Sequence, residues 1–306
     1  MNAAPSSALS DRFGGDWTMT PLAQGFCATW RARRDPAAAR SSEDLFVKTL
    51  PLARAPVLQA EVDGLAALSA AGGIRVPAVA GCWVDPARDL ALLALEWLAL
   101  SSAPAPRFGE RLAQRLAALH GMPPAEGDGR FGWRRDNWLG GTPQRNRWSA
   151  QGGLAGWLAF LADERLGAMG ERLSGHGADC ALLEALRRLI AALPSFFDDG
   201  HVPRPSLVHG DLWSGNWGSL QGGVPVLYDP AVSVSDAEAE LAMMELFGAP
   251  PPGFFPAYRE AAGLAAGYAR RRPLYQLYHL LNHALLFGGG YARQSLALMH
   301  GLLGRR

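Results

Sequence analysis

The 306-residue sequence has few cysteines, no long apolar run and no excess of charge of either sign. Its three cysteines are far apart and odd in number, so they suggest neither a disulfide framework nor a metal site, and a reducing cytoplasm is the simplest setting. The most hydrophobic segment, residues 90–100, is too short to span a bilayer and contains Glu96. A formal net charge of +1 gives no electrostatic reason to expect a nucleic-acid or membrane-surface protein. We therefore expect a soluble cytoplasmic protein, whose oligomeric state the sequence leaves open.

The composition and the apolar pattern predict an α+β fold with two lobes. Hydrophobic residues make up 49% of the chain, which is enough for a sizeable core. Glycine, proline or charged turns separate short apolar or alternating segments in the first hundred residues, a pattern typical of strands. One helix, 55–72, interrupts them, and amphipathic helices dominate from 107 onward. We predict an N-terminal lobe, residues 1–98, with a five-stranded sheet and one helix that bind nucleotide, and a larger, mainly helical C-terminal lobe, residues 99–306, with the catalytic loop and the substrate site. The strand-like segments are 16–23, 26–33, 44–50, 79–84 and 90–98.

The stretch "LVHGDLWSGNWG", residues 207–218, contains an acid and an amide at a spacing with chemical meaning. Asp211 precedes Asn216 by five positions, and Asp229 ends the next apolar run. In protein kinases, an aspartate at this spacing accepts or orients the proton of the attacking hydroxyl, and the asparagine binds Mg²⁺. Magnesium prefers oxygen ligands, often one or two carboxylates together with phosphate oxygens. The alternative is that these three residues have only a structural role in turns, where Asp and Asn are common.

Upstream residues favour the kinase interpretation. Lys48 ends a strand-like segment, and Glu61 follows thirteen residues later inside the predicted helix. A kinase uses such a lysine to hold the nucleotide phosphates and such a glutamate to hold the lysine, although either residue alone is more commonly an exposed charge. Glu96 and Leu98 then fall where a hinge would offer backbone groups to adenine. The order of these features predicts a protein-kinase-like nucleotide site.

Three longer motifs resemble one kinase family. The segments "LVHGDLWSGNWG", "FGWRRDNWLGGTPQRN" and "PLYQLYHLLNHALLFGGGY" look like those of the fructosamine kinase (ketosamine-3-kinase) family, and the likeness extends from about residue 45 to the end. The resemblance implies a protein-kinase-like, aminoglycoside-phosphotransferase-like fold. It also implies that ATP with Mg²⁺ phosphorylates a sugar hydroxyl of a ketoamine, a glycated amine that is either a small molecule or a protein lysine, as a step of deglycation.

The resemblance also implies roles for individual residues. Asp211 would be the catalytic base, and Asn216 and Asp229 would bind Mg²⁺. Lys48 and Glu61 would hold the nucleotide beside the hinge. Trp213, Asp136 and Asn137 lie in matched segments and become candidates for the substrate site.

Two departures from the family pattern leave alternatives open. The expected phosphate loop, "PLAQGFCATW", has one glycine and the bulky Phe26, where the family usually has two glycines and a small polar residue. The segment "VSVSDAEAEL", residues 232–241, lacks the tyrosines and basic residues common after the metal-binding aspartate. A phosphotransferase for aminoglycosides or amino alcohols is therefore a second hypothesis, and it would need an acidic pocket built from residues such as Asp236, Glu238, Glu240 and the 136 region. A nucleotide-binding pseudokinase is the third.

Overall fold

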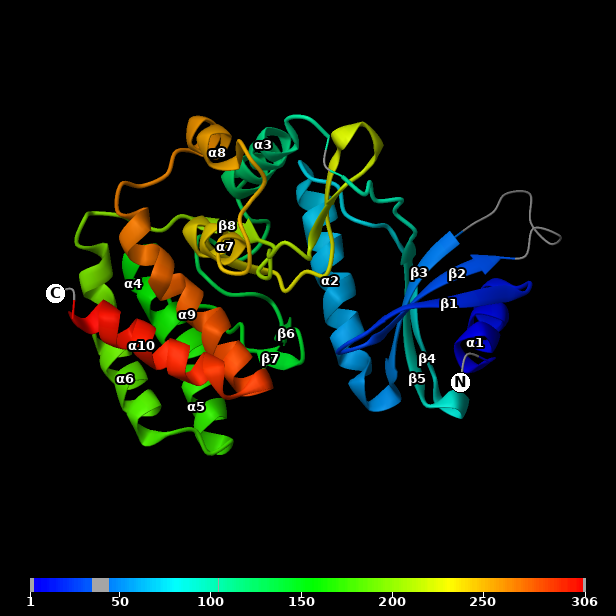
Figure 1. Cartoon of the computed structure of the whole chain (residues 1–306), viewed down its shortest axis with the longest axis horizontal. Coiled ribbons are helices and arrows are strands. Elements are labelled where there is room, and N and C mark those ends of the chain that lie inside the picture. Colours follow the sequence, from blue (N-terminus) through cyan, green and yellow to red (C-terminus); the bar gives the residue numbers. More distant parts are fainter. Residues whose placement is uncertain (1–2, 35–43, 104, 305–306) are drawn as a thin grey trace.

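The computed structural model describes residues 3–34, 44–103 and 105–304. It has a β-rich part at one end and a helical part at the other, with helix α2 between them (Figure 1). The predicted α+β class, with a small β-rich lobe followed by a mainly helical lobe, is confirmed. The precise boundary after residue 98 stays a prediction.

The N-terminal part is a five-stranded antiparallel sheet with the strand order β1-β2-β3-β5-β4. Strand β5 shows why the sheet is stable, because Leu93 and Leu95 face the core beside α2 while Ala94 faces the opposite side. A run buried on both faces reads as continuous hydrophobic sequence. The strands are β1 Trp17–Gln24, β2 Ala28–Arg34, β3 Asp44–Pro51, β4 Val79–Asp85 and β5 Leu90–Glu96.

Two helices flank this sheet, where the sequence analysis predicts one. Helix α2, Ala55–Ala71, is the predicted helix. Helix α1, Ala3–Phe13, is an additional element that covers the outer face of the sheet. Its serine-rich sequence carries little apolar periodicity, and its fully buried Leu9 secures it by tertiary packing.

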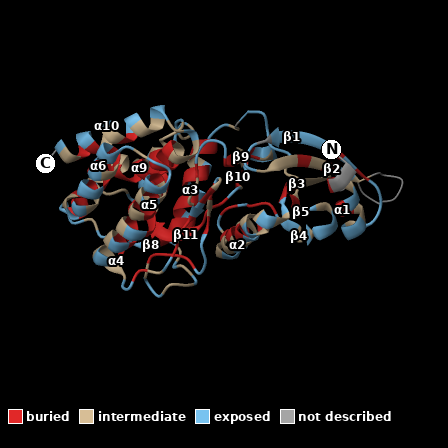
Figure 2. Ribbon diagram, turned by 90° about the horizontal axis from the view of Figure 1, so that it is seen from below, coloured by how far each residue is buried: buried red, intermediate tan, exposed pale blue. Residues whose placement is uncertain are grey.

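The C-terminal part contains helices and three short two-stranded sheets (Figure 1). The most deeply buried segments in Figure 2 lie around β8, β11 and α9. The strands are β6 Asn137–Leu139, β7 Thr142–Gln144, β8 Pro205–Val208, β9 Trp217–Ser219, β10 Pro225–Leu227 and β11 Ser233–Asp236. The helices are α3 Phe108–Gly121, α4 Gly153–Phe160, α5 Ala168–Gly175, α6 Cys180–Ala191, α7 Ala237–Met244, α8 Phe254–Ala262, α9 Tyr268–Phe287 and α10 Gly290–Gly304.

One hydrophobic core joins the two parts. Leu58 and Leu65 of α2 belong to the same cluster as Leu112 of α3, Leu207 of β8 and Leu227 of β10. Complete burial of a leucine stabilises a fold by about 2 kcal/mol, so this shared cluster fixes α2 firmly against α3, β8 and β10.

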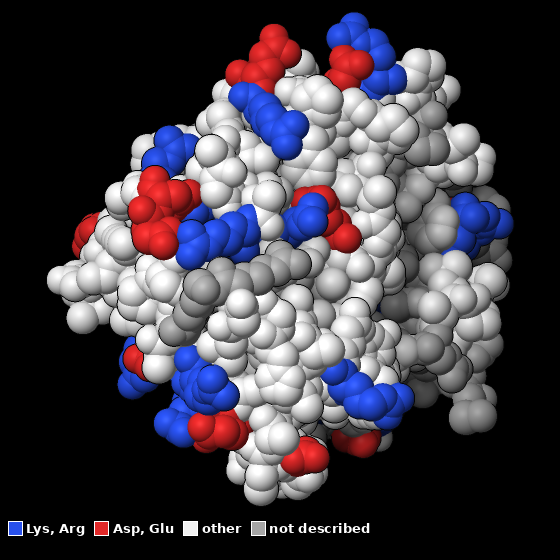
Figure 3. Space-filling view, turned by 60° about the vertical axis from the view of Figure 1, so that its left-hand side comes forward, with Lys and Arg blue, Asp and Glu red and all other residues white. Residues whose placement is uncertain are grey.

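The outer surface of the helical part shows acidic and basic side chains intermixed, without a broad patch of one sign on the face drawn in Figure 3. Among the described helices, none combines the length and the apolar character that crossing a membrane requires.

Candidate active site

An ion network joins the two parts of the molecule at Lys48. This lysine lies on β3, where it is almost fully buried. Its Nζ donates to Glu61 Oε2 of α2 at 2.8 Å and to Asp229 Oδ1 at 2.7 Å. Strand, helix and the segment after β10 thus meet at one cation, as the kinase interpretation of the sequence expects.

The electrostatics of this network keep Lys48 charged. Burial alone would lower the pKa of Lys48, but the carboxylates of Asp229 and Glu61 raise it overall. Burial raises the pKa of Glu61, although Lys48 acts against that shift. The second oxygen of Glu61, Oε1, is buried and has no hydrogen-bond partner among the described residues. The network therefore carries unused hydrogen-bonding capacity.

The predicted catalytic loop lies between β8 and β9. Asn216 is buried, and its Nδ2 donates to the Asp211 backbone oxygen at 2.7 Å and to Asp211 Oδ2 at 3.3 Å. Because the amide nitrogen is engaged with Asp211, the amide oxygen is the atom of Asn216 suited to a ligand. The sequence spacing of five therefore produces a compact acid–amide pair.

Internal hydrogen bonds hold this loop in place. His209 is fully buried, and its Nδ1 accepts from Asp211 N at 3.3 Å, so its Nε2 donates to the Tyr228 carbonyl at 2.8 Å. Gly210 has a φ of 86°, and a Cβ there would lie 2.1 Å from the Ala231 carbonyl oxygen. Only glycine fits this position. The two residues that precede Asp211 are thus structural, and burial lowers the pKa of His209.

The surroundings of Asp211 suit a proton acceptor. Burial, followed by the charge of Asp229, raises the pKa of Asp211 to about 7. A general base works best when its pKa lies near the working pH. Asp229 itself has a φ of 60°, an uncommon backbone conformation for a residue other than glycine. Such conformations persist where the surrounding structure enforces them, often at functional sites.

Two adjoining cavities surround these groups. A cavity of about 560 Å³ brings together the five predicted polar residues Lys48, Glu61, Asp211, Asn216 and Asp229. A second cavity of about 220 Å³ shares Asp229 and has apolar walls formed by residues such as Leu22, Phe46, Leu95 and Tyr228. An apolar slot beside a charged chamber suits a flat base joined to phosphates.

The residues predicted to form the hinge line the smaller cavity. Glu96 and Leu98 both belong to its wall. The Glu96 carboxylate forms an ion pair with Arg75. Its Oε2 also accepts a hydrogen bond from Ala78 N at 3.0 Å. A nucleotide would therefore meet the backbone of this segment rather than the Glu96 side chain.

The three candidate substrate residues occupy different environments. Trp213 lines the larger cavity and is 39% exposed. Asn137 reaches the same wall, but its amide donates to the Val232 carbonyl at 2.8 Å and accepts from Gln144 at 2.8 Å. Asp136 Oδ1 accepts from Asn146 N at 2.8 Å and lies outside the cavity wall. The substrate roles of all three stay predictions, and Trp213 has the most suitable position.

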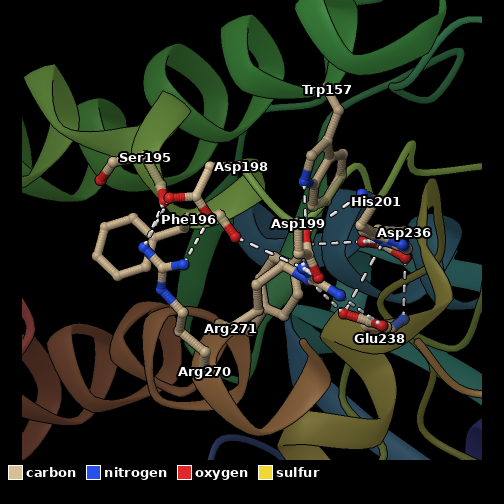
Figure 4. Close-up of polar contacts among 11 residues, drawn as sticks. Trp157, Ser195, Phe196, Asp198, Asp199, His201, Asp236, Glu238, Arg270 and Arg271 are labelled. Atoms are coloured by element: carbon tan, nitrogen blue, oxygen red, sulfur yellow. Dashed lines mark hydrogen bonds and ion pairs between the residues drawn. The ribbon is translucent and has the colours of Figure 1, made fainter. Parts of the chain in front are cut away.

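The acidic residues after Asp229 do not form an open pocket. Figure 4 shows Asp199 and Glu238 converging on Arg271, with Asp236 facing His201. Arg271 is fully buried and donates to Glu238 Oε2 at 2.7 Å and to both oxygens of Asp199 at 2.7 Å.

Asp236 and Glu240 are also buried and internally bonded. Asp236 accepts from Tyr275 at 2.6 Å and from His201 at 3.0 Å. Glu240 lies 2.8 Å from His120 and accepts from Gly210 N at 2.8 Å. These carboxylates support the fold and the catalytic loop, so the acidic pocket that a polycationic substrate requires is not built from them.

Two residues of the cavity wall are not among the predicted site residues. Trp138 and Gly140, in the β6–β7 hairpin, line the larger cavity beside Phe26 and Cys27 of the β1–β2 loop. The only signal for them was their place in the matched segment 131–146. Apolar and glycine residues in a loop give no sign of which cavity they face until the tertiary structure is known.

Known proteins resemble this chain over most of its length. The sequence model of the fructosamine kinase family matches residues 30–305. A probable ketoamine kinase of Synechocystis is 40% identical over 264 residues, covering 83% of this chain and 81% of the relative. A chloroplastic protein-ribulosamine 3-kinase of Oryza sativa subsp. japonica is 33% identical over 258 residues, covering 84% and 72% of the two chains.

A crystal structure of a fructosamine-3-kinase homologue extends the likeness to three dimensions. The structure, titled a putative fructosamine-3-kinase of Thermobifida fusca, superimposes with a TM-score of 0.79 at 30% identity and covers 99% of each chain. The predicted protein-kinase-like fold and the predicted resemblance are thereby confirmed.

Proposed function

This chain belongs to the fructosamine kinase family, and from that premise we propose that it transfers the γ-phosphoryl group of ATP to a sugar hydroxyl of a ketoamine. The chemistry is that of a phosphotransferase with an alcohol acceptor. The observation that carries the proposal is the meeting of Lys48, Glu61, Asp211, Asn216 and Asp229 at one cavity of about 560 Å³.

Asp211 is the proposed base. Its carboxylate lies beside Asn216, and its pKa of about 7 allows it to take a proton from the sugar hydroxyl near neutral pH. Phosphoryl transfer depends mainly on positioning and on charge stabilisation, so a modest proton acceptor is sufficient. Which hydroxyl reacts depends on how the sugar lies against Asp211.

Asn216 and Asp229 are the proposed holders of Mg²⁺. They supply an amide oxygen and a carboxylate at the same cavity, and the Asp229 side chain is 45% exposed there. Hard oxygen donors of this kind fit magnesium, which also takes oxygens from the nucleotide phosphates. When bound, the ion neutralises charge that develops on the phosphates.

Lys48 is the proposed phosphate-binding cation. In the structure, Asp229 and Glu61 both accept hydrogen bonds from its Nζ. An ammonium group rotates freely and exchanges partners at little geometric cost. Lys48 can therefore turn from Asp229 toward the nucleotide phosphates, while Glu61 continues to hold it.

The acceptor we propose is a ketoamine, either free or attached to a protein lysine. The family supports this choice, and the relative from rice carries the name of a kinase for protein-bound ribulosamines. Trp213 offers an exposed aromatic face next to the base, suited to contact with the sugar or the amine. The aminoglycoside alternative is not favoured, because Asp236, Glu238 and Glu240 are buried and internally bonded.

The direct test is ATP consumption by the purified protein with Mg²⁺ and a synthetic fructosamine. We expect ketoamine-dependent turnover, and Asp211→Asn should lower kcat about 1,000-fold without weakening MgATP binding in a thermal-shift titration. Parallel reactions with an aminoglycoside, an amino alcohol and a glycated protein define the acceptor class. Tight MgATP binding without turnover on any acceptor would contradict the proposal and favour a pseudokinase.

A further inference from the structure

The β1–β2 loop, which should cover the nucleotide phosphates, carries an exposed aromatic side chain at its tip. Phe26 is 45% exposed. The backbone of the loop is tied to its own lobe, because Arg54 Nη1 donates to the Phe26 carbonyl at 3.4 Å and Thr29 Oγ1 bonds both backbone groups of Ala23 at 3.1 Å. The Phe26 ring is therefore held where it can reach beyond that lobe.

The ring packs on a glycine pair of the C-terminal part. The β6–β7 hairpin turns at Gly140 and Gly141, since Leu139 pairs with Thr142. A Cβ added to Gly140 would lie 2.9 Å from Phe26 Cε2, and one added to Gly141 would lie 2.8 Å from Phe26 Cδ1 and Cε1. The Phe26 ring thus occupies the space that side chains on this turn would fill.

The turn geometry explains only one of the two glycines. Gly140 has a φ of 60°, whereas Gly141 lies outside the positive-φ region. A positive φ at the first central residue alone is the pattern of a type II′ hairpin turn, whose second position accepts residues other than glycine. The absence of a side chain at Gly141 is therefore explained by the approach of Phe26.

We infer that Phe26 is a positioning residue that pins the phosphate loop across the active-site cavity onto the Gly140–Gly141 turn. Phe26 and Gly140 both line the cavity that holds Lys48 and Asp211, so their contact is part of its wall. This inference rests on the proposed transfer from MgATP.

The contact between Phe26 and the turn compensates for the second glycine that the phosphate loop of this chain lacks. A loop with one glycine has fewer ways to bring its N–H groups close to phosphate, but a loop already fixed by a tertiary contact loses less freedom when the nucleotide binds. A closed wall also excludes water that would otherwise compete with the acceptor for the phosphoryl group.

The kinetic test is a double-mutant cycle of Phe26→Ala and Gly141→Ala. We expect each single variant to raise the KM for ATP about fivefold, with kcat changed by less than about twofold, and to raise ATP hydrolysis without acceptor relative to transfer. The double variant should resemble Phe26→Ala alone, because Gly141 acts only through Phe26. Gly301→Ala in α10 is the matched control, since a Cβ there meets nothing within 4 Å. Additive effects, or an unchanged KM in Gly141→Ala, would overturn the inference.

A second test needs no kinase activity. Cys27, next to Phe26, is partly buried in the cavity wall. We expect Gly141→Ala to increase alkylation of Cys27 by N-ethylmaleimide several-fold, measured by peptide mass spectrometry, while Gly301→Ala leaves it unchanged. The same rate in Gly141→Ala and wild type would overturn the positioning role of Phe26. Faster alkylation in a protein that lacks ketoamine turnover would support that role and refute the proposed function, so the two failures are distinguishable.

Discussion

Two buried cations in this molecule have similar partners but differ in how fully their partners are hydrogen-bonded. Lys48 is held by Glu61 and Asp229, and Arg271 is held by Glu238 and Asp199. In each cluster one carboxylate side chain is less exposed than the other: Glu61 less than Asp229, and Glu238 less than Asp199. The difference lies in the remaining hydrogen-bonding capacity. Arg271 donates in a fork to both oxygens of Glu238, at 2.7 and 3.1 Å (Figure 4), whereas Glu61 keeps one oxygen without a partner among the described residues.

The choice of cation matches the two tasks. A guanidinium presents donors in a rigid plane and fixes its partners permanently, while an ammonium is a rotating point charge that exchanges partners. The Arg271 cluster is therefore a scaffold, and the Lys48 cluster is prepared for a ligand. Substitutions in the Lys48 cluster should therefore lower activity more than stability. Substitutions in the Arg271 cluster should lower stability more than activity.

The largest effect should come from Asp229→Asn. The loss of the metal-binding carboxylate should lower kcat/KM about 1,000-fold, which corresponds to about 4 kcal/mol. Asparagine tolerates the φ of 60° at this position, and its amide oxygen can still accept from Lys48. We expect the melting temperature to fall less than in Glu238→Gln, because the Asp229 side chain is 45% exposed and water can replace part of its interaction; differential scanning calorimetry can verify this. A large loss of stability with intact activity would reverse the assignment of the two clusters.

Glu238→Gln should show the opposite behaviour. It leaves the fully buried Arg271 with only Asp199 as an anionic partner, at a cost of about 3 kcal/mol and a fall in melting temperature of several degrees. Below the transition, kcat should stay within about twofold of wild type. Glu184→Gln, at the exposed pair with Arg187, is the control and should leave the melting temperature unchanged. An unaltered melting temperature in Glu238→Gln would show that the scaffold role is incorrect.

Glu61→Gln should have a smaller effect that falls on the nucleotide. The variant keeps an oxygen for Lys48 but loses the charge that holds the lysine when Asp229 turns toward the metal. We expect the KM for ATP to rise about tenfold, equivalent to about 1.4 kcal/mol, with a minor change in the KM for the ketoamine. Steady-state kinetics with each substrate varied in turn can measure this. Equal increases in both values would indicate a general distortion of the site.

The smallest effect should be a pH dependence at the edge of the scaffold. Burial alone would lower the pKa of His201, but the hydrogen bond and charge of Asp236 raise it overall, with a further contribution from Glu238. Protonated His201 therefore stabilises the fold below its unfolded-state pKa of about 6.5, and this contribution is lost as the pH rises through the higher folded-state value.

Urea unfolding of wild type and His201→Gln can measure this linkage. The difference in unfolding free energy between the two proteins should be larger near pH 6 than near pH 8, because the pKa of His201 is raised in the folded state. A difference that grows with pH would contradict the raised pKa.

The spacing of the kinase motifs predicted which polar residues meet at the larger cavity. Asp211 and Asn216 lie in one short loop, and Lys48 and Glu61 lie on consecutive elements, so local geometry determines much of their arrangement. The buried contacts of the acidic residues after Asp229 could not be predicted in this way. Glu240 meets His120 across 120 positions of sequence, and the pattern "SDAEAEL" does not reveal whether its acids face solvent or the core. The same limit applies to Asn137 and to Phe26, whose partners come from distant segments.

The hydrophobic cluster shared by α2, α3, β8 and β10 has a consequence for folding. Because Leu58 and Leu65 pack in the same core as Leu207 and Leu227, neither part of the chain can lose its structure without exposing apolar surface of the other. The two lobes should therefore unfold in one cooperative transition. A ligand bound at the cavity between the lobes then protects from proteolysis even those helices that it does not contact.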